Sequence, residues 1–178
     1  MRRWAILLSG ERRTFDGVRQ LIEDGLLREL DNVTVFDCSD VAQPPLAISG
    51  RSIVDVRIDP LSFTWPSSAA QPVLTQLERN HICWESVKRH QGNRPFDVIV
   101  RTRPDMAVVR PLRLGSLVRL HAANMSRILL ARARCWPDGK LPRAAWTYGH
   151  TRCGGESLAD DAFFVVGGGA AADAVFSR

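Results

Sequence analysis

The sequence predicts a single α/β domain over residues 1–178, with a mostly parallel central sheet flanked by helices. Short apolar runs at 4–8, 33–36 and 96–101 indicate strands, and apolar residues at helical spacing over 14–30 and 72–91 indicate helices. Strands and helices that alternate along a chain are typical of such a sheet. With 178 residues, of which 45% are hydrophobic, the chain is long enough to bury one sizeable core.

The first strand, turn and helix form a recognisable unit. Trp4–Leu8 is apolar throughout, as expected of a central strand that is covered on both faces. Ser9-Gly10 then predicts a turn, and Thr14 is suited to cap the helix that follows. With the strand at Val33–Phe36, this stretch is the βαβ unit that opens many nucleotide-binding domains. Glycine lets a backbone approach a ligand closely, and a helix N-terminus favours anions.

The remaining elements follow from the same patterns. Alternating residues at 53–58 predict a half-exposed or edge strand. The Gly- and Pro-rich stretch 132–157 predicts a flexible loop that either faces a bound molecule, such as an acceptor, or serves as a lid, with disorder as the alternative. We expect a loop over 60–72, a short helix at 114–120, strands at 127–131 and 162–166, and a last helix at 170–176.

The stretch Phe96–Leu112 carries the charges that suggest function. A buried strand is followed by Arg101, Arg103 and Asp105, and Pro104 ends the regular pairing because it has no N–H to donate. The strand therefore brings two guanidinium groups and a carboxylate to its C-terminal edge, where open α/β sheets bind ligands. The alternative is that Arg101 and Asp105 belong to a solvated strand end and form a structural salt bridge.

Composition narrows the possible partners. The chain has 22 Arg against 2 Lys and a net charge of +5. Arginine pairs with phosphate and carboxylate, so this supply suits anionic ligands, although a lineage bias toward Arg is the simpler reason for it. The arginines are scattered and form no basic block, which argues against nucleic acid as a partner.

Cysteine usage and hydropathy bear on location. Cys38, Cys83, Cys135 and Cys153 form no CxxC pair, so we expect free thiols in a reducing compartment and a cytoplasmic protein. A zinc site from Cys135, His150 and Cys153 would lack a fourth ligand. The apolar start is too short for a signal peptide, and no run reaches the length of a membrane span.

Three segments together resemble small GT-A-type glycosyltransferases, which occur in polysaccharide biosynthesis and in some large viruses and algae. The opening S-G-x-x-R-T/S-F pattern has its counterpart in Ser9, Gly10, Arg13, Thr14 and Phe15. The second segment is the strand end R-x-R-x-D at 101–105, and the third is D-x-F-x-Φ-Φ-G at 161–167, where Φ is apolar. The chain departs from the family's DxD motif, because Arg103 stands where the first Asp would be.

The resemblance implies a GT-A-like, Rossmann-like fold and a function. Such enzymes move a sugar from a nucleotide-diphosphate donor, such as a UDP-sugar, to a hydroxyl of a saccharide or glycan acceptor. The donor would be bound by the following residues: Ser9, Gly10, Arg13, Thr14, Arg101 and Arg103. In the resembling family the helix expected at 72–91 can also carry polar residues near the donor, for which Gln76, Arg79 and Asn80 are the candidates. Asp105 would hold Mn²⁺ or Mg²⁺ against the diphosphate. Asp161, with Asp160 beside it, would activate the acceptor hydroxyl, unless the two are an ordinary cap or loop pair.

Two other functions remain open. The first is a non-catalytic module that binds a nucleotide or nucleotide-sugar, which the incomplete DxD and the short C-terminal part favour. Relatives of the resembling family usually continue beyond this point, so we expect either a domain trimmed at its C-terminus or a minimal one. The second is a nucleic-acid-binding domain, against which the scattered arginines speak.

Overall fold

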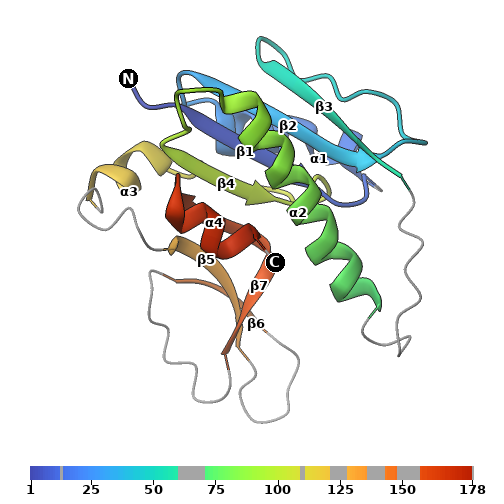
Figure 1. Ribbon diagram of the computed structural model, residues 1–178. Helices are drawn as coiled ribbons and strands as arrows, with labels where there is room; N and C mark the ends of the chain where they lie inside the picture. Colours follow the sequence, from blue (N-terminus) through green and yellow to red (C-terminus); the bar gives the residue numbers. More distant parts are fainter. Residues whose placement is uncertain are drawn as a thin grey trace.

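A computed structural model describes most of the chain (Figure 1). The described residues are 1–12, 14–59, 71–108, 111–120, 128–135, 143–147 and 157–177. For 71–74, 120, 128–135, 143–147 and 157–162 the description covers the backbone alone. The strands are β1 (Trp4–Ser9), β2 (Val33–Asp40), β3 (Ser52–Ile58), β4 (Val98–Thr102), β5 (Ile128–Cys135), β6 (Arg143–Thr147) and β7 (Ser157–Gly167). The helices are α1 (Phe15–Ile22), the π-helix η1 (Glu23–Leu27), α2 (Gln71–Gln91), α3 (Leu114–Leu120) and α4 (Ala170–Phe176).

The strands form one sheet in the order β3-β2-β1-β4-β7-β5-β6. β1 pairs in parallel with β2 on one side and with β4 on the other, and β3 continues the parallel part beyond β2. From β4 onward the pairs with β7, β5 and β6 are antiparallel. The prediction of an α/β domain with a parallel central sheet is confirmed, and the topology is compatible with a Rossmann-like fold.

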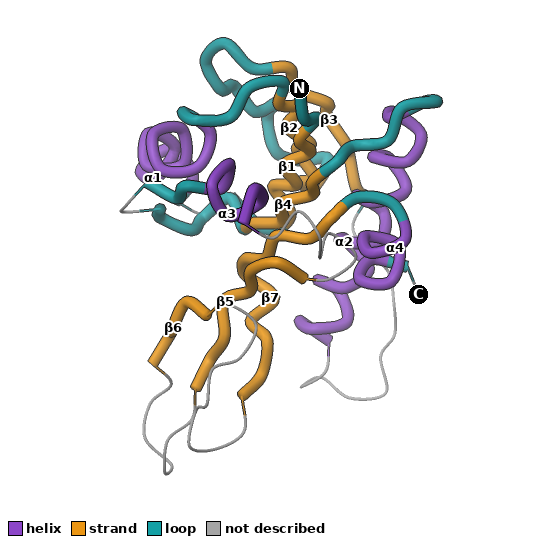
Figure 2. Tube along the Cα trace, turned by 90° about the vertical axis from the view of Figure 1, so that its left-hand side faces the viewer, coloured by secondary structure: helices purple, strands orange, loops and turns teal. Residues whose placement is uncertain are grey.

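Helices cover the two faces of the parallel part, as Figure 2 shows edge-on: α1 and α3 lie on one side of the strands, and α2 and α4 on the other. Alternate residues of each strand point to opposite faces, so Trp4, Ile6 and Leu8 join the core beneath α1 and α3. Ala5 and Leu7 join the core beneath α2 and α4. All five residues are at most 4% exposed, which explains why β1 is apolar throughout.

The first helix changes its winding where another segment crosses it. α1 continues into η1, and a Cβ built on Gly25 would come within 2.6 Å of the Val108 backbone oxygen. The Leu112 N–H donates to the Gly25 carbonyl at 2.7 Å. Glycine is therefore required here by a close approach, and the segment after β4 is bound directly to the helix. Arg51 donates to the carbonyls of Leu27 at 2.6 Å and Leu30 at 2.9 Å, which satisfies the helix end.

The prediction of free thiols is wrong for two of the four cysteines. Cys38 of β2 and Cys83 of α2 form a disulfide across 45 positions of sequence, with their Cα atoms 5.7 Å apart. Both residues are fully buried. No local pattern marks this pair, because the contact exists only once α2 lies across β2. The alternative zinc site falls on residues whose side chains lie outside the described part of the chain.

The second half of the sheet is longer than predicted. β5 extends to Cys135 and β6 occupies 143–147, so part of the expected loop at 132–157 is strand. β7 begins at Ser157, not at 162, and Asp160 and Asp161 therefore lie inside a strand and not before one. Pairing with β5 explains the difference, because backbone hydrogen bonds hold a strand together even where its sequence turns polar.

No helix within the described residues combines the length and the hydropathy needed to cross a bilayer.

Gly168, which follows β7, provides a test of the packing around β4 and β7. A Cβ at Gly168 would lie 1.8 Å from the Phe96 carbonyl oxygen, so we expect Gly168→Ala to lower the free energy of unfolding by about 3 kcal/mol through overpacking. Gly17, in α1, is the matched control, because a Cβ there meets nothing within 4 Å. Gly17→Ala should raise the free energy of unfolding by about 0.5–1 kcal/mol through helix propensity. Urea denaturation measures both, and equal effects would contradict the packing around β4 and β7.

Candidate functional site

The site lies where the chain reverses direction across the sheet. After β1 the chain moves outward to β2 and β3, and it then returns to form β4 on the other side of β1. The carboxyl ends of β1 and β4 meet at one edge, which in open α/β sheets is where ligands bind. Ser9-Gly10 ends β1, and the charged segment 101–105 ends β4, so the topology brings these two predicted segments together.

Gly10 is the point of closest approach. Its φ of 137° lies in the region that favours glycine, and a Cβ there would be 3.6 Å from Pro104 Cδ and 3.9 Å from Arg103 Cγ. The same Cβ would be 3.6 Å from Gln76 Oε1 of α2. Two segments that are far from Gly10 in sequence, α2 and the end of β4, therefore approach it closely, and a glycine lets the backbone turn between them.

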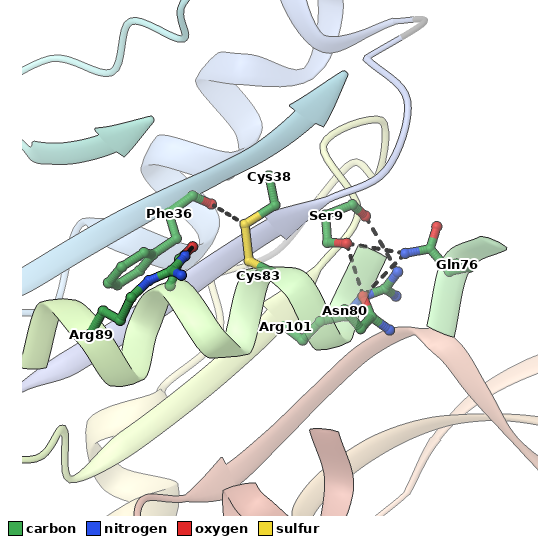
Figure 3. The surroundings of a disulfide bond; sticks show 9 residues. Ser9, Phe36, Cys38, Gln76, Asn80, Cys83, Arg89 and Arg101 are labelled. Atoms are coloured by element: carbon green, nitrogen blue, oxygen red, sulfur yellow. Dashed lines mark hydrogen bonds between the residues drawn. A yellow bond between two sulfur atoms is a disulfide. The ribbon is translucent and has the colours of Figure 1, made fainter. Parts of the chain in front are cut away.

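Below this point lies a buried polar cluster made by β1, β4 and α2 (Figure 3). Asn80 Oδ1 accepts hydrogen bonds from Ser9 Oγ at 2.8 Å, Gln76 Nε2 at 3.1 Å and Arg101 Nε at 3.3 Å. Arg101 Nη2 also donates to the Ser9 carbonyl at 3.3 Å, and Gln76 Nε2 to Ser9 Oγ at 3.1 Å. Ser9 and Arg101 are fully buried and Asn80 is 6% exposed, so the amide oxygen of Asn80 fixes where the Arg101 guanidinium lies.

Arg103 and Asp105 form a two-bonded ion pair just above the cluster. Arg103 Nε donates to Asp105 Oδ1 at 2.8 Å, and Arg103 Nη2 donates to Asp105 Oδ2 at 2.7 Å. The Arg103 side chain is 35% exposed and that of Asp105 is 17% exposed, so solvent reaches both. The structure thus pairs Asp105 with Arg103, whereas the salt-bridge alternative paired it with Arg101, which is fully buried.

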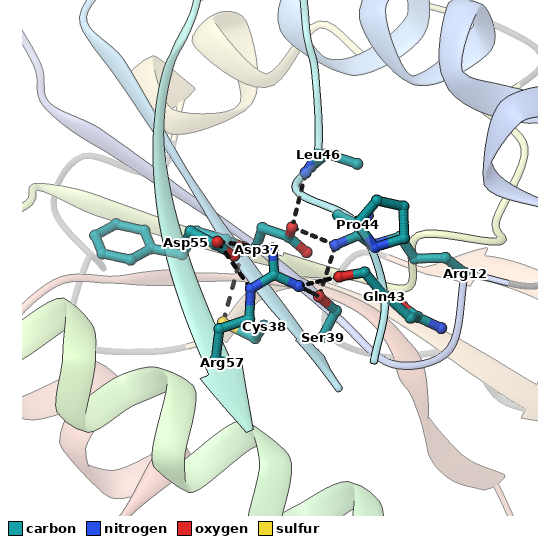
Figure 4. A network of polar contacts seen from close by, with 10 residues as sticks. Arg12, Asp37, Cys38, Ser39, Gln43, Pro44, Leu46, Asp55 and Arg57 are labelled. Carbon is teal, nitrogen blue, oxygen red and sulfur yellow. Dashed lines mark hydrogen bonds and ion pairs between the residues drawn. The ribbon is translucent and has the colours of Figure 1, made fainter. Parts of the chain in front are cut away.

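A second polar network occupies the α1 face of the same edge (Figure 4). Arg12 pairs with Asp37 at the end of β2 and donates to Ser39 Oγ at 2.6 Å and to the Pro44 carbonyl at 2.5 Å. Asp37 also accepts the Leu46 N–H at 3.2 Å. This face is thus organised around an ion pair, whereas on the α2 face Asn80 accepts from amide, hydroxyl and guanidinium donors.

A cavity of about 290 Å³ opens beside this network. Arg12, Phe15 and Leu46 line it from below, and Arg19 and Gln43 line it nearer the surface. Its volume is at the lower end of the range of small-molecule sites, so it is large enough for one ring system.

Burial raises the pKa of Asp37 above its ordinary 3.8, while the charge of Arg12 and the hydrogen bonds from Ser39 and Leu46 act in the opposite direction. The Asp37 side chain is only 2% exposed. Burial therefore disfavours the ionised form of Asp37, and the stabilisation from its partners only partly offsets this.

The other predicted site residues are placed less completely. Thr14 caps α1 through its backbone position, is exposed, and makes no side-chain capping bond. Arg13 lies outside the described residues. Asp160 and Asp161 are described in backbone alone, three and two residues before Phe163, which pairs with Thr102 at the end of β4. The register therefore carries their backbone past the end of β4, to the edge that holds the candidate site.

The sequence predictions missed two of the residues that hold this edge together. Arg12 and Asp37 are not among the predicted site residues, although each is nearly buried and has several polar partners. One signal existed for Asp37: with Ser39 and Asp40 it follows an apolar strand, as Arg101 and Arg103 do. Asn80 was expected near the donor from the resemblance, but its contact with Ser9 depends on the way α2 crosses β1.

Within the described part of the chain, no three His, Cys, Asp or Glu side chains gather closely enough to hold a metal ion. Asp105 is nonetheless compatible with a cation that a ligand brings, because Mg²⁺ at nucleotide sites is often held by one or two carboxylates together with phosphate oxygens and water.

No family model, curated protein or solved structure matches the chain.

The raised pKa of Asp37 gives a prediction with a definite sign. The folded state binds the Asp37 proton more tightly than the unfolded state, so the stability from this carboxyl is present below pH 3.8 and is lost as the pH rises through the folded pKa. Asp37→Asn has no such titration. We expect the free energy of unfolding of wild type minus that of the variant to fall as the pH rises from about 4, and then to level off. Urea denaturation between about pH 4 and pH 8 measures this, and a difference that rises with pH would show that the Arg12 pair outweighs burial.

Proposed function

We propose that the protein is a glycosyltransferase that moves a sugar from a nucleotide-diphosphate donor, such as a UDP-sugar, to a hydroxyl of a saccharide or glycan acceptor. The observation that carries the proposal is the meeting of Gly10, Arg101 and Arg103 at the carboxyl ends of β1 and β4. A bare backbone flanked by guanidinium groups suits a diphosphate, because glycine allows close approach and arginine pairs with phosphate oxygens. The GT-A-like assignment of the fold belongs to this proposal.

Each polar group at this edge would bind a different part of the nucleotide-sugar donor. Arg103 is solvent-accessible and would bind the diphosphate, while buried Arg101, held by Asn80, would supply positive charge from below. Arg13 and Thr14 would complete the contacts at the start of α1. The cavity beside Arg12 and Phe15 would hold the nucleoside, because its volume of about 290 Å³ accommodates one ring system beside an apolar floor.

The Arg103–Asp105 pair is suited to exchange its partners. In the protein alone each charge has an opposite charge at 2.8 Å or closer. A diphosphate with a divalent cation offers the same two charges, so Arg103 would turn to phosphate and Asp105 to Mn²⁺ or Mg²⁺. When bound, the cation would neutralise the leaving nucleoside diphosphate. Neither side chain would be left unpaired by the exchange, so its electrostatic cost is small.

On the acceptor side, we propose that Asp161 accepts the proton of the attacking hydroxyl, with Asp160 as its neighbour. The support is topological: the register of β7 on β4 carries both residues past Thr102. A general base must lie within hydrogen-bond reach of the hydroxyl, and this edge is where the donor sugar would project.

A non-catalytic module that binds a nucleotide or nucleotide-sugar is the second candidate. The Arg103–Asp105 pair favours it, because an aspartate in a two-bonded ion pair is a weaker metal ligand than the two carboxylates of a DxD motif. The module and the enzyme would share the donor site and differ on the acceptor side.

The cytoplasmic location remains part of the proposal, although the free thiols from which it was inferred are not found at Cys38 and Cys83. Disulfides persist mainly in oxidising compartments, and Cys38 and Cys83 form one.

The donor site has a matched control within the chain. Asp55 and Arg57 of β3 form an ion pair with the same spacing as Arg103 and Asp105, with Arg57 Nε 2.8 Å from Asp55 Oδ2, but two strands away from β1. We expect Asp105→Asn to reduce the Mn²⁺-dependent part of UDP binding, and Arg103→Ala to weaken UDP binding by about 1.5–3 kcal/mol, as for a charge-assisted contact. Asp55→Asn should leave both unchanged. Isothermal titration with UDP, with and without Mn²⁺, measures these effects.

Two outcomes would contradict the donor site. Equal Mn²⁺ dependence in wild type and Asp105→Asn would remove Asp105 as a metal ligand. Equal losses of UDP affinity in Arg103→Ala and Asp55→Asn would show that a change of charge acts alike on β3 and after β4. The UDP pocket would then lie elsewhere.

The effect of substituting Asp161 distinguishes the glycosyltransferase from the non-catalytic module. If Asp161 activates an acceptor, Asp161→Asn should lower turnover by about 10²–10⁴-fold and leave UDP affinity nearly unchanged, because general base catalysis acts only in the transition state. Asp160→Asn should have a smaller effect. Release of nucleoside diphosphate from a panel of nucleotide-sugars, with and without simple sugar acceptors, provides the assay. Equal turnover in all three proteins would exclude both residues from the chemistry, and no turnover in wild type would favour the module.

A further inference from the structure

The Cys38–Cys83 disulfide lies directly beneath the candidate site. Cys38 stands between Asp37 and Ser39, the two side chains that bind Arg12. Cys83 is one helical turn after Asn80, which holds Ser9 and Arg101. Figure 3 shows the disulfide and the Asn80 cluster side by side along α2. The crosslink therefore joins β2, which carries the partners of Arg12, to α2, which carries Asn80.

A second contact between β2 and α2 lies close to the disulfide in sequence. Arg79 Nη2 donates to both carboxylate oxygens of Asp40, at 2.8 Å and 2.9 Å. Asp40 is two residues after Cys38, and Arg79 is four residues before Cys83. Both the Asp40–Arg79 pair and the Ser9–Asn80 hydrogen bond at 2.8 Å depend on how closely α2 approaches the sheet.

Reduction would change that approach. A disulfide holds its sulfurs about 2 Å apart, whereas sulfurs that are not bonded stay roughly 3.5–4 Å apart. Cys38 and Cys83 are both fully buried among packed side chains, so two thiols would push β2 and α2 apart. A hydrogen bond is already lost near 3.6 Å. The contacts of Asn80, at 2.8–3.3 Å, have little room for such a movement.

We propose that oxidation of Cys38 and Cys83 assembles the site, and that the reduced protein binds its anionic ligand more weakly. The oxidant is a disulfide-bearing thiol compound or oxidoreductase. The two cysteine thiols give up two protons and two electrons and form one S–S bond, and the S–S bond of the oxidant is reduced to two thiols. The part that concerns ligand affinity rests on the proposed donor site, whereas the part that concerns α2 does not.

The test compares one protein in two redox states. The full chain is equilibrated with oxidised glutathione or with a phosphine reductant, and alkylation under denaturing conditions counts the thiols. We expect the reduced form to have two more thiols and to bind UDP at least about tenfold more weakly, as for the loss of one charge-assisted contact. Cys83→Ser should bind as the reduced form in both conditions. A variant with Cys135→Ser and Cys153→Ser should keep the full response to the reductant.

A measurement without ligand keeps the proposal testable if UDP does not bind at all. Hydrogen exchange of residues 75–83 should become faster on reduction, while exchange of β4 should change little. Failure of UDP binding in both redox states would contradict the donor site, and the exchange data would still decide this proposal. Unchanged exchange at 75–83, equal UDP affinity of the two forms where UDP binds, or free thiols at Cys38 and Cys83 after oxidation would each overturn it.

Discussion

The burial of β1 on both faces is the constraint on which the structure depends. A strand that is apolar on both sides has to be covered by helices above and below and paired along both edges. Parallel partners on both sides require crossover connections, one through α1 and one through α2. The carboxyl ends of β1, β2 and β4 then meet at a single edge. The position of the candidate site is thus a consequence of how Trp4–Leu8 is buried.

The same constraint determines the chemistry beneath that edge. Side chains of β1 and β4 that continue the alternation past the apolar core are buried and polar, and each needs partners. On the α2 face Asn80 supplies them for Ser9 and Arg101. On the α1 face Arg12 supplies them for Asp37. Removing one partner would leave a buried polar group unsatisfied, so these clusters fix the positions of α2 and of the segment after β2.

Much of the fold was predictable because its signals are local. The apolar runs of β1, β2 and β4 and the stripe of α1 each reflect burial against a neighbour, and burial leaves a period in the sequence. Ser9-Gly10 and the segment 101–105 were predictable as strand ends, and their proximity follows from the topology alone.

Other features depend on contacts that no local pattern encodes. β7 passes through Asp160 and Asp161 because β5 pairs with it. Cys38 meets Cys83, and Ser9 meets Asn80, only because α2 crosses β2 and β1 at a particular height. Adjacent aspartates and widely spaced cysteines are common in loops and in reduced proteins as well, so their spacing in the chain does not identify these contacts.

If the proposed function holds, Arg103 is the residue that most distinguishes this site from the DxD motif of GT-A-type glycosyltransferases. In a DxD motif two carboxylates gather a cation, and the cation then gathers the diphosphate. An arginine in place of the first aspartate raises the formal charge of the site by two, and the Arg103–Asp105 pair is neutral by itself. A diphosphate can approach such a pair directly, because arginine binds phosphate without a bridging ion. On this reasoning the cation would be a supplement to the proposed donor site and not its foundation, and the guanidinium groups of Arg101 and Arg103 at the end of β4 would be the primary recognition element.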